Sequence, residues 1–147
     1  MKKYFNFAKA MLAIIFLTVA VSANAADCSK VVGITCDAFS KMANQVKKCK
    51  SLDDLSTLDF DNVVNNMDFG DLPDSCLEYR LTSADKTKLK KSIDIFSDSI
   101  VDKMVEFTDG VISREYVKGE MDKEMSKFKT IIDQSVTYQD FVNGVEK

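Results

Sequence analysis

Apolar residues recur at intervals of three and four along most of this chain, the spacing expected when a helix buries one face. The clearest series follows a capping signal, Thr82 with Asp85 three residues later, and ends before Gly110, a residue suited to the position after a helix end. The pattern therefore predicts one long helix between Thr82 and Gly110. Its apolar positions are Leu89, Ile93, Phe96, Ile100, Met104 and Phe107.

A second long helix is predicted from about Ser113, because the same spacing continues beyond the glycine. Thr137 and Asp140 form another capping signal, which predicts a short terminal helix after it. Because only a short turn separates the two long helices, we expect them to form an antiparallel hairpin. The apolar positions of these two elements are Val117, Met121, Met125, Phe128 and Ile132, then Phe141, Val142 and Val145.

The first helix of the domain is expected to begin late. Between positions 31 and 35, β-branched residues surround Gly33, which makes this stretch a poor helix former. We therefore expect the helix to start directly afterwards, with Thr35 as its N-cap. Its apolar face would comprise Cys36, Phe39, Met42, Ala43, Val46 and Cys49.

Residues 51–79 carry seven Asp and one Glu but no Lys or Arg. We expect a short helix here with Thr57 as its N-cap, and a turn at residues 70–73. Asp59 and Asp61 could be the first two ligands of a calcium loop, but valines at positions 63 and 64 occupy the next ligand and the required glycine. No metal site and no cofactor are predicted. The whole chain, with one Pro and five Gly, is expected to be an all-α small helical bundle.

The N-terminus has the pattern of a secretory leader. Lys2, Lys3 and Lys9 precede an apolar run over residues 10–21, and Ala23 and Ala25 fit an Ala-x-Ala cleavage site. The run is shorter than the roughly 20 residues that span a bilayer. We therefore expect a signal peptide over residues 1–25 and a single exported domain over residues 26–147, periplasmic or secreted and without stable membrane insertion.

All four cysteines follow the predicted cleavage site, and an even count in an exported chain indicates two disulfides. Cys36 and Cys49 would lie about 20 Å apart on a continuous helix, too far to pair. We expect Cys28–Cys36 with Cys49–Cys76, and leave Cys28–Cys49 with Cys36–Cys76 open. In either case the two bonds would brace the bundle.

Composition excludes several classes of function. The chain has no His, so neither a Ser-His-Asp triad nor a histidine-ligated zinc site can form. A formal net charge of −3 argues against nucleic-acid binding, which normally uses a basic face. Loss of the leader with its three lysines would leave 17 basic and 23 acidic residues, a net charge of −6. No catalytic motif is present, and we expect a protein that is not an enzyme.

One surface of the first long helix is unusually acidic. Asp94, Asp98, Asp102 and Glu106 stand four residues apart and so form a stripe along one face, called here the acidic stripe. Two interpretations remain open. Bases of the next helix, such as Lys123 and Lys127, could neutralise it within the chain, or it could dock a basic partner.

These observations favour an exported, non-enzymatic helical module that binds another protein, as an inhibitor, immunity-type protein or adaptor of the bacterial envelope. The acidic stripe is its expected partner-binding surface, and it would serve a homodimer as readily. The alternative is a periplasmic stress chaperone of the holdase type, activated in acid. Below about pH 4 the exported chain would move from −6 towards +17, because no His buffers the change.

Overall fold

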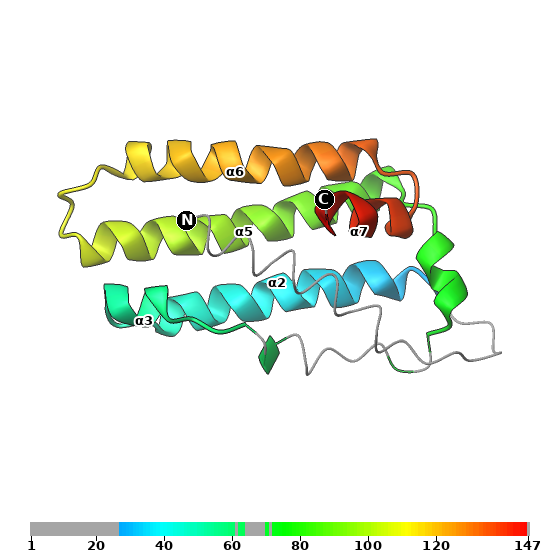
Figure 1. Cartoon of the computed structure of the whole chain (residues 1–147), viewed down its shortest axis with the longest axis horizontal. Coiled ribbons are helices and arrows are strands. Elements are labelled where there is room, and N and C mark those ends of the chain that lie inside the picture. Colours follow the sequence, from blue (N-terminus) through cyan, green and yellow to red (C-terminus); the bar gives the residue numbers. More distant parts are fainter. Residues whose placement is uncertain (1–26, 61, 64–69, 71, 147) are drawn as a thin grey trace.

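The computed structural model describes residues 27–60, 62–63, 70 and 72–146 (Figure 1). The predicted signal peptide, residues 1–25, lies outside them. The described chain is helical, which confirms the predicted all-α class, and its one β-type pairing is an isolated bridge between Arg80 and Thr137. The elements are α2 (Lys30–Lys48), α3 (Leu52–Ser56), the 3-10 helix η1 (Asp74–Glu78), α5 (Ser83–Phe107), α6 (Arg114–Gln134) and α7 (Tyr138–Glu146).

The three long helices lie side by side, with α5 between α2 and α6 (Figure 1). Each buries most of the face that its apolar spacing predicts, including Met42 on α2, Ile100 on α5 and Met121 on α6. The predicted positions Cys36, Met104 and Phe107 are only partly buried. The short helix α7 contacts α6 and η1. Its buried residues Phe141 and Val145 extend the same core. α5 therefore organises the bundle, since both other long helices pack on it.

Three side-chain contacts join distant parts of the core. The ring of Phe96 on α5 lies 6.2 Å from that of Phe39 on α2 and 5.8 Å from that of Phe60, which follows α3. Near the start of α2, the buried Tyr138 hydroxyl lies 2.6 Å from the Thr35 hydroxyl. Because Thr35 donates its proton to the Val31 carbonyl, Tyr138 is the donor in this pair. Burial raises the pKa of Tyr138 to about 12, so it stays neutral and can donate.

The start of α2 differs from the prediction. The helix begins at Lys30, so Thr35 is an interior residue and not the N-cap. Val31, Val32 and Thr35 are all buried in the core, and that burial outweighs the weak helix propensity of a β-branched stretch. Local propensity was therefore a poor guide at this position.

The ends of the later helices match the predictions more closely. Thr82 and Asp85 form a full capping box at α5, Ser113 caps α6, and Thr137 accepts a hydrogen bond from the Asp140 N–H at the start of α7. The prediction for α3 was wrong, because the cap there is Ser51 and Thr57 follows the helix. After α5, the residue next to the C-cap is Asp109 (φ 49°), with Gly110 (φ 72°) one place later. Asp tolerates this left-handed conformation better than most residues.

The expectation of two disulfides was wrong. The structure contains one, Cys28–Cys76, while Cys36 and Cys49 carry free thiols. Both expected pairings fail because α2 starts early. Cys36 lies more than a turn inside the helix, about 12 Å along its axis from Cys28. The 19 residues of α2 place Cys49 about 28 Å from Cys28, and so from Cys76, which is bonded to Cys28. The exclusion of a Cys36–Cys49 bond agrees with this geometry.

The Asp85 carboxylate gives a testable contribution to stability. Burial raises its pKa, but hydrogen bonds from the Thr82 N–H and the Tyr79 hydroxyl outweigh burial and hold the pKa below 3.8. We expect Asp85→Ala to lower the free energy of unfolding by about 1–3 kcal/mol at neutral pH. Urea denaturation measures this, with Asp94→Ala as the exposed control.

The pH dependence of this difference follows from the sign of the shift. A carboxyl whose pKa is depressed by folding stabilises the protein above its unfolded pKa, and this contribution is lost as pH falls through the folded value. The difference in the free energy of unfolding between wild type and Asp85→Ala should therefore become smaller below about pH 4. A gap that stayed constant down to pH 2 would contradict this role for the carboxylate.

Candidate protein-binding surfaces

The acidic stripe lies along α5 beside α6, and each of its carboxylates has a basic partner. Asp94 pairs with Lys129, and Asp98 lies 3.5 Å from Lys118. The remaining two salt bridges are Asp102–Arg114 and Glu106–Lys103. All four carboxylates are about half exposed, so each pair contributes at most about 1 kcal/mol.

The bases that contact the stripe from α6 are Arg114, Lys118 and Lys129. Lys123, one of the two bases expected there, instead pairs with Glu120 of its own helix. The pKa of Lys118 is raised by Asp122 and by Asp98, as expected for an ammonium between two carboxylates. The stripe is therefore one half of a mixed-charge seam between α5 and α6. Its docking of a basic partner stays a prediction.

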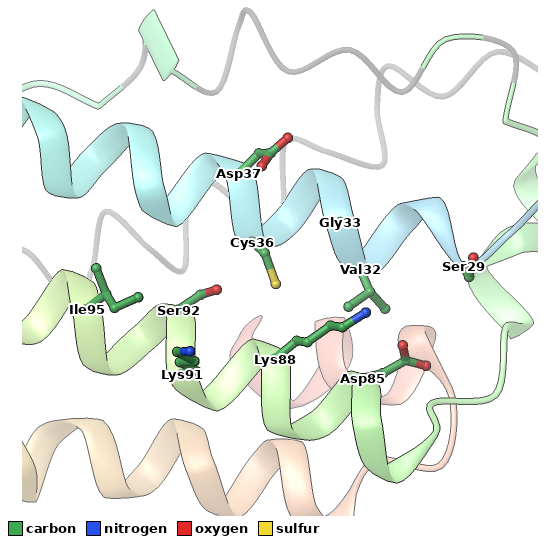
Figure 2. A pocket seen from close by; sticks show the side chains of 10 residues that line it. All are labelled: Ser29, Val32, Gly33, Cys36, Asp37, Asp85, Lys88, Lys91, Ser92 and Ile95. Atoms are coloured by element: carbon green, nitrogen blue, oxygen red, sulfur yellow. The ribbon is translucent and has the colours of Figure 1, made fainter.

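A second surface, which was not predicted from the sequence, is a groove between α2 and α5 (Figure 2). It encloses about 340 Å³ and is open to solvent on one side. Gly33 faces open space here, because a Cβ atom at that position would meet no other atom within 4 Å. The lining residues are Ser29, Val32, Gly33, Cys36 and Asp37 from the α2 side, with Asp85, Lys88, Lys91, Ser92 and Ile95 from α5.

The half-buried thiol of Cys36 points from α2 toward α5 inside this groove (Figure 2). Burial raises the pKa of Cys36, and a hydrogen bond with Ser92 offsets this only in part. The thiol is therefore protonated at neutral pH and is a poor nucleophile. Cys49, the other free cysteine, is buried and donates to the Gln45 carbonyl.

Ile95 supplies an exposed apolar side chain at the groove. It lies beside the α5 core face formed by Ile93 and Phe96, and 43% of its surface is accessible. The other large exposed apolar residues of the described chain lie outside the groove: Leu52, Val111, Tyr116 and Val136. The sequence did contain a signal for this surface, since Ile95 breaks the spacing of three and four on which the core prediction rests.

The lysines of the groove differ from the other bases of α5 and α6. Lys88 and Lys91 form no salt bridge or hydrogen bond with any described residue, whereas every other Lys and Arg of these two helices has at least one. Of the two carboxylates lining the groove, Asp85 is engaged by Tyr79 and Thr82. Asp37 points away from α5 (Figure 2). Lys88 and Lys91 are therefore the charged groups that face the groove without a hydrogen-bonded partner, although Asp85 interacts with Lys88 electrostatically.

No protein-family model, no curated protein and no solved structure matches this chain. Among residues 27–146 that the structure describes, no helix has the length and apolar character needed to cross a membrane. The described part of the chain also holds no group of three or more Cys, Asp or Glu side chains arranged to bind a metal ion.

Proposed function

We propose that this protein is an exported, non-enzymatic helical module that binds another protein, of the inhibitor, immunity-type or adaptor kind, in the bacterial envelope. The observation that carries the proposal is the open groove between α2 and α5, with Ile95 exposed at it. Apolar side chains set in a concave surface are typical anchors of protein interfaces. The α5–α6 hairpin would give that surface a rigid support.

Two further observations support the proposal. The Cys28–Cys76 disulfide fits an oxidising compartment outside the cytoplasm. The one free thiol in the groove, Cys36, is held in its neutral form, which favours a binding role for this surface over nucleophilic catalysis.

Replacing Ile95 by Asp is expected to abolish partner capture. With the purified, oxidised protein immobilised as bait at neutral pH, wild type should retain one envelope protein in a one-to-one ratio. Ile95→Asp should retain at least about tenfold less, because a carboxylate would be desolvated at an apolar contact. Quantitative elution of the bound protein measures the difference.

Val136→Asp is the matched control, because Val136 is also an exposed apolar residue but lies outside the groove. This variant should capture the partner as wild type does, and both variants should keep the wild-type denaturation midpoint. Equal capture by wild type and Ile95→Asp, or equal loss in both variants, would show that the groove is not the docking surface.

A second candidate function, an acid-activated holdase, is favoured by the seam between α5 and α6. Three of its salt bridges depend on exposed carboxylates of the acidic stripe, Asp94, Asp98 and Asp102. Exposed salt bridges of this kind need charged carboxylates, and strong acid removes that charge. Repeating the capture near pH 3 distinguishes the two functions, since a holdase would retain many unfolded clients only in acid. Native near-UV circular dichroism at that pH would argue against it.

A further inference from the structure

We propose that the partner places an acidic segment in the groove between α2 and α5, and that its carboxylates pair with Lys88 and Lys91. This inference rests on the function proposed above and specifies the chemistry of the occupant. The segment would carry two carboxylates close together, with an apolar side chain beside them to contact Ile95.

The charge argument comes from a contrast within the same two helices. Lys90 lies 2.7 Å from the Asp133 carboxylate, and Lys86 donates to the Asp133 carbonyl at 2.9 Å, so α6 offers acceptors to the α5 lysines that face it. Lys88 and Lys91 alternate with them in sequence but line the groove, where no described acceptor reaches them. Two ammonium groups at one concave surface favour an anionic occupant over a neutral or cationic one.

The two carboxylates that line the groove form no salt bridge with its lysines. Asp85 already accepts hydrogen bonds from Tyr79 and from the Thr82 N–H. Asp37 projects from α2 on the side away from α5, whereas Lys88 extends along the groove beside Val32 (Figure 2). The Asp85 carboxylate interacts with Lys88 electrostatically but forms no salt bridge with it, so both lysines keep their hydrogen-bonding capacity for an incoming carboxylate.

The spacing of the two lysines indicates the spacing of the acids. Residues three apart on a helix have Cβ atoms about 5–6 Å from each other. Carboxylates separated by one helical turn, or by two residues in an extended segment, would match this separation. Val32 and Ile95 line the same groove and provide the apolar contact. A second copy of this chain fits less well, because the carboxylates of its acidic stripe are already paired with bases.

Selection from a phage-displayed library of random dodecapeptides tests the proposal on the full oxidised protein. We expect the enriched peptides to be rich in Asp and Glu next to an aliphatic residue. Lys88→Gln/Lys91→Gln should bind them roughly tenfold more weakly than wild type, since two exposed ion pairs are lost. Lys123→Gln/Lys127→Gln changes the net charge equally on α6, outside the groove, and should bind them as wild type does.

The native thiol of Cys36 reports where the peptides bind. In a Cys49→Ala background Cys36 is the one free thiol, and an enriched peptide should slow its reaction with a chromogenic thiol reagent. Enrichment of neutral or basic peptides, unchanged affinity in Lys88→Gln/Lys91→Gln, or no protection of Cys36 would overturn the inference. So would a dimer of this chain that depends on Lys88 and Lys91, which would assign the groove to a second copy.

The outcomes also separate this inference from the proposed function. If Ile95→Asp abolishes capture of the envelope partner while Lys88→Gln/Lys91→Gln captures it normally, the groove binds a protein, but the inference that an acidic segment occupies it is wrong. If Ile95→Asp captures the partner normally, the proposed docking surface itself is wrong.

Discussion

Replacing Cys28 or Cys76 by Ser is expected to lower the free energy of unfolding by about 4 kcal/mol. The disulfide joins residues with a sequence separation of 48, and without it the unfolded chain gains the conformational entropy of that whole loop. It also ties the start of α2 to η1, so its loss releases two elements at once. Urea denaturation followed by circular dichroism measures the change, and reduction of the wild type should reproduce it.

Cys36→Ser is the matched control for this prediction. Cys36 is half-buried and unbonded, and a serine hydroxyl can keep the contact with Ser92, so the variant should stay within about 1 kcal/mol of wild type. If Cys36→Ser destabilised the protein as much as Cys28→Ser, or if reduction left the denaturation midpoint unchanged, the Cys28–Cys76 bond would not be the source of the expected stabilisation.

The other large effect is expected at Phe96. Its ring is 2% exposed and contacts both Phe39 on α2 and Phe60 after α3, so removal would leave a cavity shared by three elements. We expect Phe96→Ala to lower the free energy of unfolding by about 3–5 kcal/mol. Calorimetry or urea denaturation at neutral pH measures the loss.

Tyr116→Ala provides the control, because this α6 aromatic is 64% exposed. Its removal should change the free energy of unfolding by no more than about 0.5 kcal/mol. A loss below about 1 kcal/mol for Phe96→Ala would mean that α2 and the segment at Phe60 do not close over α5 as described.

The features that the sequence predicts well are those set by neighbours in the chain. The capping boxes at Thr82 and Thr137 need only a hydroxyl and a carboxylate three residues later, and both form. The buried faces of α5 and α6 follow directly from apolar spacing, as at Ile93 and Phe128.

The errors arise where distant residues decide the outcome. α2 includes the stretch around Gly33 because Val31, Val32 and Thr35 are buried, and Thr35 gains a bond with Tyr138, 103 residues away. That longer helix in turn decides which cysteines can meet. No local pattern in the sequence carries this information, so the disulfide prediction failed with the helix boundary.

The candidate sites show the same division. The acidic stripe follows from a spacing of four, yet its pairing with Arg114, Lys118 and Lys129 depends on how α6 lies against α5. The groove joins Cys36 to Ile95, from helices far apart in sequence. Only their packing creates it, and Ile95, the apolar residue out of step with the core, was its one sequence signal.

The covalent ring closed by Cys28 and Cys76 affects the resistance of the protein to proteolysis. The ring includes α2, α3 and the long connection up to η1. A single cut anywhere inside it would leave both new ends tied to the same molecule, and α2 would keep its place on α5. A protease would have to cut that ring twice, or cut outside it, before any fragment could dissociate.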